Sequence, residues 1–340
     1  MVPPKKQKPG IGLFKKGEGK MATDVANELK EVDSVEVTTL MDNYTDVLLR
    51  NAPGVTRPPL AIKGNIPDDA LLAEHGLSLM ITVKRDKESH CILFDCGYTK
   101  IGVPHNMEIL GVDPQQIEAI VLSHGHMDHS GALYPIAKSL DKSIPLILHP
   151  DAFISPRFFG LDDGRKLIFP QTLIREDIEK NTDLKIVEEK SPSLLTDNMI
   201  AVTGEVERVT EFEKGLPNAS MERNGKIEPD MILDDQSLVI KVKDKGLVII
   251  SGCGHAGIIN TVFYARKITG IDNIHAVLGG FHLSGPIFEP IIEKTIIEFK
   301  KINPAVIVPM HCTGWEAIKR FSEEFPSSFV LNSVGTRINF

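Results

Sequence analysis

The sequence has few cysteines, and their spacing matches no common metal or redox motif. The chain of 340 residues contains four, namely Cys91, Cys96, Cys253 and Cys312, and no two of them form a CxxC pair. This spacing excludes a disulfide framework, a zinc ribbon and a thioredoxin-type site. We therefore expect reduced thiols and a cytoplasmic protein.

The chain also lacks an excess of positive charge and lacks long apolar runs. Its 38 Lys and Arg against 46 Asp and Glu give a formal charge of -8, which argues against nucleic acid as a partner. No apolar run approaches the roughly 20 residues of a membrane-spanning helix. The basic residues Lys5, Lys6 and Lys8 are not followed by the apolar segment of a secretory signal. We expect neither a nucleic-acid nor a membrane partner, and the sequence leaves open whether the protein is a homo-oligomer.

What is present is the composition of a globular enzyme, 42% hydrophobic and 25% charged. We assign residues 1–33 to a basic and polar N-terminal tail, which is rich in Lys, Gly and Pro up to about Met21. Residues 34–340 are expected to form the folded domain. A polar, loop-rich insertion at about 150–197 serves either as a lid over the site or as plain surface.

Apolar segments predict the secondary structure of this domain. Strands are predicted, from their apolar and β-branched residues, at 35–41, 77–83, 91–94, 119–122, 146–148, 199–203, 237–242, 247–250, 276–278 and 306–308. Helices are predicted at 114–119, 133–139, 256–268 and 290–301. Two similar halves of mixed strands and helices predict an α/β fold with two sheets face to face and helices outside.

The most informative segment is Ser-His-Gly-His-Met-Asp-His-Ser-Gly at 123–131, directly after the apolar strand 119–122. Three imidazoles and a carboxylate in six residues are the usual donors for zinc and related divalent metals. Without a cation, so many crowded polar groups would be poorly satisfied. The segment therefore predicts a metal site with ligands on this loop.

This motif resembles the His-x-His-x-Asp-His signature of the metallo-β-lactamase superfamily. The resemblance implies a four-layer αββα sandwich that holds one or two divalent ions, zinc by default, with manganese or iron as alternatives. It implies that His124 and His126 bind the first metal and that Asp128 and His129 bind the second. Asp95, in Phe-Asp-Cys-Gly at 94–97, resembles the early Asp-x-Gly element, which implies that its carboxylate orients the ligand loop.

Further ligands must come from distant parts of the chain. His311 ends an apolar strand and matches the superfamily's last histidine, and His255 lies between a strand and a helix start, so we predict both as ligands. His282 also follows a strand, and we assign it to the substrate or to proton transfer. Cys253 stands where many members have a bridging Asp; it either bridges or is a small buried residue near the ligands, and occupancy by one or two metals stays open.

Other segments resemble one branch of the superfamily, the 7,8-dihydropterin-6-yl-methyl-4-(β-D-ribofuranosyl)aminobenzene-5'-phosphate synthases and dihydropteroate-synthase-like proteins. These segments are 42–46, 74–78, 203–205, 211–213, 251–260 and 279–283. The substrates of that branch suggest a phosphate site at Gly254 and Gly257, where backbone approaches an anion at a helix start. The alternative is that these glycines serve only the geometry of the turn.

The leading hypothesis is a zinc-type hydrolase in which a metal-activated water attacks a small, anionic, phosphorylated substrate. Asp128 would orient or deprotonate this water, and His282 or His75 would protonate the leaving group. One alternative is a condensing synthase of methanopterin-type pterin biosynthesis that uses the metals as Lewis acids. Another is a metal-stabilised binding protein without turnover. Redox iron chemistry is disfavoured because flavodiiron relatives carry Glu at the position of His126.

Overall fold

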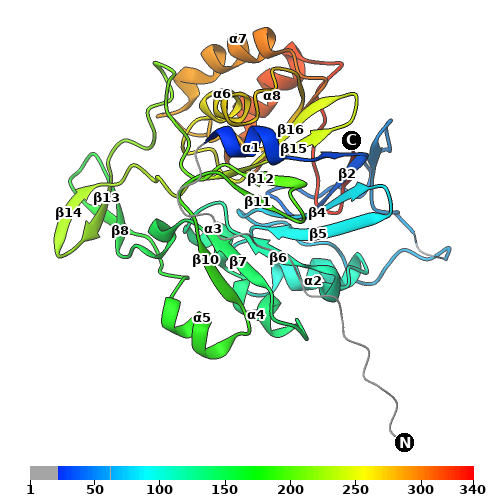
Figure 1. Ribbon diagram of the computed structural model, residues 1–340, viewed down its shortest axis with the longest axis horizontal. Helices are drawn as coiled ribbons and strands as arrows, with labels where there is room; N and C mark the ends of the chain where they lie inside the picture. Colours follow the sequence, from blue (N-terminus) through cyan, green and yellow to red (C-terminus); the bar gives the residue numbers. More distant parts are fainter. Residues whose placement is uncertain (1–21, 62) are drawn as a thin grey trace, which may run out of the picture.

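The computed structural model describes residues 22–61 and 63–340. In them, two large mixed sheets stack face to face (Figure 1). One sheet has the strand order β11 (Ser193–Leu195), β12 (Ile200–Val202), β15 (Ser237–Val242), β16 (Gly246–Ser251), β17 (Ile274–Gly280) and β18 (Val306–Met310), with β1 (Glu31–Val32) paired to β15. The other has the order β10 (Lys185–Glu188), β7 (Pro145–Leu148), β6 (Ala119–Val121), β5 (Glu88–Phe94), β4 (Ser78–Arg85), β2 (Ser34–Met41), β19 (Arg337–Asn339) and β3 (Val55–Thr56).

Helices cover the outer faces of both sheets, which confirms the predicted αββα sandwich (Figure 1). The face of the sheet that contains β5 to β7 carries α2 (Gly102–Ile109), α4 (Leu133–Lys138) and α5 (Arg175–Asn181). The face of the sheet that contains β15 to β18 carries α1 (Ala22–Glu28), α6 (Ile258–Thr269), α7 (Ile292–Ile302) and α8 (Trp315–Glu324). Short 3-10 turns are η1 (Pro114–Gln116), η2 (Pro150–Phe153), η3 (Glu289–Ile291) and η4 (His311–Thr313).

The main core lies between the sheets and is built by alternation along the strands. Val35 and Val37 of β2 are fully buried in it, as are Ile240 of β15 and Ile250 of β16. Each such side chain contributes roughly 1.5–3 kcal/mol through its transfer out of water. This core fixes the strand ends, and the loops that follow them carry the functional residues.

The assignment of residues 1–33 to an N-terminal tail needs correction for residues 22–33. Its first part, residues 1–21, lies outside the described residues, but α1 and β1 fall within the assigned range of 1–33. Val25 of α1 and Leu29, which directly follows the helix, are buried where α1 packs against α6. β1 then pairs in parallel with β15. Residues 22–33 therefore belong to the domain because they bury apolar side chains against it.

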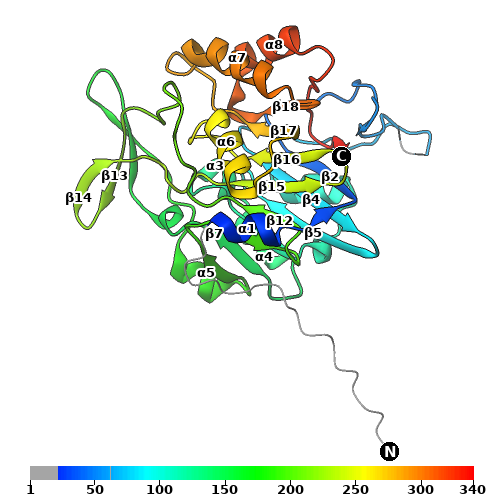
Figure 2. The same cartoon turned by 45° about the horizontal axis from the view of Figure 1, so that its top comes forward.

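The predicted insertion at 150–197 contains more regular structure than a loop. It holds η2, β8 (Arg157–Gly160), β9 (Lys166–Ile168), α5, β10 and β11. β8 and β9 combine with β13 (Ala219–Arg223) and β14 (Lys226–Pro229) in a small sheet of order β14-β13-β8-β9. We call it the side sheet, because it projects from the sandwich in both views (Figures 1 and 2). A lid function for this region stays a prediction.

One predicted helix is shorter than expected, and the expectation about membrane spans is examined only in the described residues. The helix expected at 114–119 ends at Gln116, because the strand β6 begins at Ala119 and pairs with β5. Among residues 22–61 and 63–340, no helix has the length and hydropathy to cross a bilayer.

Candidate metal centre

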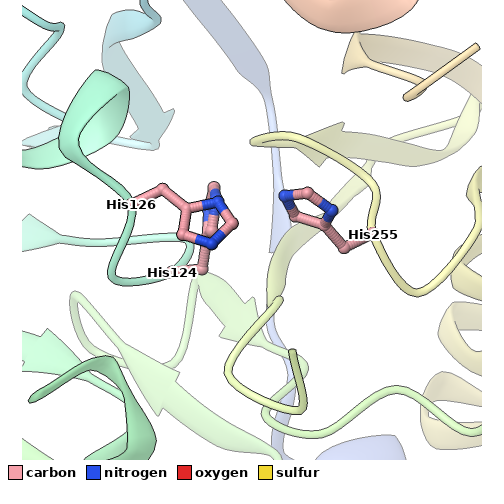
Figure 3. Close-up of side chains that lie close together, drawn as sticks. All are labelled: His124, His126 and His255. Carbon is pink, nitrogen blue, oxygen red and sulfur yellow. The ribbon is translucent and has the colours of Figure 1, made fainter. Parts of the chain in front are cut away.

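Three buried histidines from facing loops form what we call the first cluster: His124, His126 and His255. His124 and His126 follow β6, whereas His255 lies between β16 and α6. Figure 3 shows the first two rings extending from one loop toward the ring of His255 on the opposite loop. One ligand atom from each residue lies within 4.8 Å of the other two.

The protonation state of the first cluster suits a cation. Burial, reinforced by the charge of Arg157, lowers the pKa of His126 to about 3. Burial and neighbouring histidines likewise hold the pKa values of His124 and His255 well below their usual range. These imidazoles are therefore neutral, with lone pairs available.

Several ring nitrogens of the first cluster lack a partner within the described part of the chain. They are Nε2 of His124 and both ring nitrogens of His255, all of them buried. A buried polar atom without a partner costs about 1–3 kcal/mol, and a bound cation removes that cost. The residues present therefore fit a divalent metal with nitrogen ligands.

Asp128, His129 and His311 form what we call the second cluster. Nε2 of His311 lies 3.2 Å from Nε2 of His129 and 3.4 Å from Oδ2 of Asp128. Nε2 of His129 lies 3.8 Å from Oδ2 of Asp128. Ligands bound tetrahedrally at zinc distances are separated by about 3.3 Å. The three donors are thus already close to the spacing that a shared cation requires.

The electrostatics of the second cluster oppose those of the first. Burial alone lowers the pKa of His129, but the negative charges of Asp95 and Asp128 outweigh burial and raise that pKa to about 9. Burial would raise the pKa of Asp128, yet His129 and His311 hold it below its usual value. Without a metal, His129 is therefore an imidazolium between two carboxylates.

Asp95 connects the two clusters through Ser123. Its Oδ1 accepts a hydrogen bond from the Ser123 amide at 2.7 Å. Its Oδ2 accepts a hydrogen bond from Ser123 Oγ at 2.7 Å and also lies 2.7 Å from His129 Nδ1. Ser123 Oγ in turn lies 3.0 Å from His124 Nδ1. Asp95 adopts φ of 62°, a strained conformation that these contacts maintain. This geometry suits the predicted orienting role.

His75 and His282 flank the clusters. His75 Nε2 lies 3.8 Å from Asp128 Oδ2, and its side chain is 64% exposed. The His282 ring packs on His255 with centroids 4.2 Å apart, and its Nδ1 lies 3.3 Å from Cys253 Sγ. His75 therefore forms a group of potential ligands with Asp128 and His311, and His282 forms one with Cys253 and His255, at the more exposed edge of the centre.

Two adjoining cavities open beside the clusters. The first, of about 340 Å³, is lined by apolar and polar side chains that include Phe212, Glu213, Lys214, His282 and Phe288. The second, of about 320 Å³, is lined by residues that include His75, Asp128, Cys253, Phe159 and Phe169. His255 and His282 line both, so the cavities meet at the metal centre.

The phosphate site at Gly254 and Gly257 stays a prediction, and a neighbouring carboxylate competes with it. The Glu213 carboxylate already occupies the start of α6, where it accepts hydrogen bonds from the amides of Ile259 at 3.0 Å and Asn260 at 2.9 Å. A Cβ on Gly257 would lie 2.3 Å from Glu213 Oε2, and one on Gly254 would lie 2.8 Å from a backbone oxygen. These close approaches support the alternative that the glycines serve the geometry of the turn. Burial also raises the pKa of Glu213 to about 7.

Sequence reasoning missed the residues that hold His311. Asp42 Oδ1 accepts a hydrogen bond from the His311 amide at 2.8 Å, and Asn43 Oδ1 lies 3.2 Å from His311 Nδ1. The available signal was a pair of polar residues directly after the strand β2. It also missed Phe169, whose ring stacks on His126 with centroids 4.7 Å apart.

It further missed two carboxylates behind the ligand loops. Asp234 Oδ2 accepts a hydrogen bond from the Gly125 amide, and Asp235 Oδ2 accepts one from the Ala256 amide, both at 2.8 Å. Burial raises the pKa of Asp235 to about 6. Each carboxylate therefore fixes one of the two loops that supply the first cluster.

Comparison with known proteins agrees with this fold. The model of the metallo-beta-lactamase superfamily matches residues 74–210. A solved metal-dependent hydrolase of the beta-lactamase superfamily shares the fold, with a TM-score of 0.66 and 24% identity over 89% of this chain and 98% of that chain. Among sequences, the chain is 33% identical over 319 residues to the 7,8-dihydropterin-6-methyl-4-(beta-D-ribofuranosyl)-aminobenzene-5'-phosphate synthase of Methanocaldococcus jannaschii, covering 91% of this chain and 98% of the synthase. The chain therefore belongs to the metallo-beta-lactamase superfamily, in the branch that contains this synthase.

A second relative from the same organism, an uncharacterized protein, is 34% identical over 268 residues, covering 77% of this chain and 92% of that protein. The chain is an enzyme, because it belongs to a superfamily of metallo-hydrolases and to the branch of it that contains a synthase. The alternative of a binding protein without turnover is set aside.

Proposed function

We propose that the chain is a metal-dependent synthase that joins the 6-methylene of a 7,8-dihydropterin to the amine of a 4-(β-D-ribofuranosyl)aminobenzene 5'-phosphate. One observation carries this proposal: the 33% identity to the synthase named for that product, which extends over 91% of this chain and 98% of the relative. The sequence-based hypothesis of a hydrolase moves to second place, because the relative with a named activity forms a bond.

In this proposal, His124, His126 and His255 hold one divalent ion, and Asp128, His129 and His311 hold a second. The neutral, unpartnered nitrogens of the first cluster and the donor spacing of the second support the assignment. A metal held by these residues would supply Lewis acidity toward an oxygen of the leaving group. Zinc is the first ion to test, followed by manganese and iron, because imidazole and carboxylate accept all three.

The chain's own residues move the protons. The amine nitrogen forms a bond to the methylene carbon, the bond from that carbon to the leaving oxygen breaks, and the amine loses a proton. His282 accepts this proton, a role supported by its ring lining both cavities. His75 donates a proton to the leaving group, supported by its position 3.8 Å from Asp128 at the exposed edge of the centre.

The cavities support a flat, anionic pair of substrates. Phe212, Ile287 and Phe288 give the larger cavity apolar and aromatic walls of the kind that pack against a planar ring. Lys214 lines the same cavity and supplies a positive charge for a phosphate. The volumes of about 340 and 320 Å³ leave room for one ring system on either side of the metal centre.

Hydrolysis of a small phosphorylated substrate is the second candidate. The observation that favours it is the position of Asp128, which lines the open cavity while it contacts His311 in the second cluster. A carboxylate at that place is suited to orient an attacking water.

The test supplies the protein with both substrates of the condensation. Protein reloaded with zinc, manganese or ferrous iron is incubated with the aminobenzene riboside phosphate and a dihydropterin that carries a diphosphate on its 6-methylene. We expect the conjugate to form in wild type and not in His124→Ala, as measured by mass spectrometry. The control variant His90→Ala should retain activity, because His90 pairs with Glu118 on another part of the domain.

A generic phosphodiester is assayed in parallel. Turnover of the diester without formation of the conjugate would replace the synthase proposal with the hydrolase. Stoichiometric metal with turnover of neither substrate would overturn both.

A further inference from the structure

One cysteine lies between the two clusters. Cys253 follows β16 and is 3% exposed. Its Sγ lies within 4.8 Å of the donor atoms of His124 and His129, and it also forms such close groups with His255 and His282 and with His311 and Cys312. The sulfur therefore reaches ligand atoms of both clusters.

Two of the other three buried cysteines provide a contrast. Cys91 and Cys96 belong to the apolar cluster beneath α2 and α4, packed among leucine, isoleucine and methionine side chains. In the described residues, neither joins a group of potential metal ligands. Burial of a small residue therefore explains Cys91 and Cys96, but it does not explain why Cys253 is surrounded by imidazoles.

Charge balance gives Cys253 a chemical role. The first cluster consists of neutral imidazoles, and the second contributes one carboxylate, that of Asp128. Two dications would bring four positive charges into this buried space, against the carboxylates of Asp128 and of Asp95, which contacts His129. A buried charge without compensation is costly, and an anionic sulfur between the ions would reduce that cost. Thiolate is also a good ligand for zinc and cobalt.

We infer that the Cys253 thiolate is a metal ligand shared between the two clusters. On metal binding, the Cys253 S–H bond breaks, its proton leaves to solvent and a sulfur–metal bond forms, with no change in oxidation state. Cys312 supports this ligand without replacing it: its thiol donates a hydrogen bond to the Cys253 carbonyl oxygen at 3.0 Å, and its Sγ lies 3.2 Å from that of Cys253. The inference rests on the metal centre of the proposed function, but not on the reaction assigned to it.

Cobalt spectroscopy tests the inference directly. Chelator-treated, fully reduced protein is titrated anaerobically with Co²⁺, and the near-ultraviolet sulfur-to-cobalt charge-transfer band is recorded together with bound cobalt. We expect the band in wild type, in Cys312→Ser and in the control Cys91→Ala. In Cys253→Ser the band should vanish and the affinity for cobalt should fall tenfold or more.

X-ray absorption of wild-type protein loaded with zinc is a second measurement, and it does not depend on whether any variant folds. We expect a sulfur ligand at about 2.3 Å. Bound metal with neither band nor sulfur ligand would overturn the inference, as would a band that survives Cys253→Ser and disappears in Cys312→Ser. A protein that binds no metal would overturn both the inference and the proposed centre. A band without condensation product would overturn the synthase alone.

Discussion

The two clusters share one loop but differ in charge. His124 and His126 of the first cluster are held neutral, with the pKa of His126 lowered to about 3, whereas His129, three residues further on, has its pKa raised to about 9. Burial lowers the pKa of both residues, and the charge of Arg157 adds to that effect at His126. At His129 the carboxylates of distant Asp95 and of neighbouring Asp128 outweigh burial. The loop after β6 thus contributes to a first cluster that is neutral and available to a cation, and to a second cluster whose His129 already carries a positive charge as a bound proton.

The largest effect should come from removing one ligand of each cluster. His124→Ala should empty the first cluster and His311→Ala the second, so each variant should bind one metal ion fewer by elemental analysis. Because a bound metal supplies several kcal/mol of charge stabilisation, condensation should slow at least about ten-thousandfold in both. Equal metal content in wild type and either variant would contradict the division into two clusters.

The pH dependence of stability in chelator-treated protein should separate the clusters. The folded pKa of His129 is about 9, above its ordinary 6.5, so its stabilising contribution is complete below pH 6.5 and is lost as the pH rises to 9. That loss is on the order of 3 kcal/mol. The folded pKa of His126 is about 3, below the same ordinary value, so stability should also fall as the pH drops from 6.5 toward 3.

Denaturant unfolding between pH 5 and 9 measures both trends. Asp95→Asn removes the charge that raises the His129 pKa, and should therefore flatten the alkaline decline. His126→Gln should lessen the acidic decline, to which His124 and His255 also contribute, and leave the alkaline one in place. An unchanged alkaline slope in Asp95→Asn would show that another group is responsible.

A smaller and selective effect is expected from Asn43. Because Asn43 contacts both the ring and the backbone of His311, Asn43→Ala should weaken the second metal ion about tenfold to a hundredfold and spare the first. Competition with a chelating dye measures both affinities. Asn65→Ala, in an exposed part of the same connection, is the matched control. Equal weakening of both ions would mean that Asn43 acts on the whole fold.

The smallest effect should come from Phe169, the corresponding neighbour of the first cluster. A stacked ring contributes about 0.5–1.5 kcal/mol, so Phe169→Leu should weaken the first ion by about tenfold at most. Phe158→Leu serves as control, because that ring lies under Lys166 instead. If the second ion weakened more than the first, the assignment of Phe169 to the first cluster would be wrong.

The sequence predicted well those features whose cause is local. The strands β2, β4, β15 and β16 follow from their apolar residues, and the loop after β6 follows from its crowded donors. The missed features depend on contacts between distant segments. Asp42 and His311 are 269 residues apart, and nothing near either residue indicates the other. Glu213 shows the same limit: its carboxylate lies at the start of α6, beside the glycines at which a phosphate site is predicted, and no local pattern indicates it.

The side sheet has a consequence for engineering. Its strands come from two stretches of chain, β8 and β9 before α5 and β13 and β14 after β12, and β8 pairs directly with β13. Neither hairpin retains its full hydrogen bonding without the other. Since Phe159 and Phe169 bring this sheet to the cavity, a transplant meant to alter substrate preference must exchange both hairpins together. A chimera that swaps only one would expose a bare strand edge and aggregate before its selectivity could be measured.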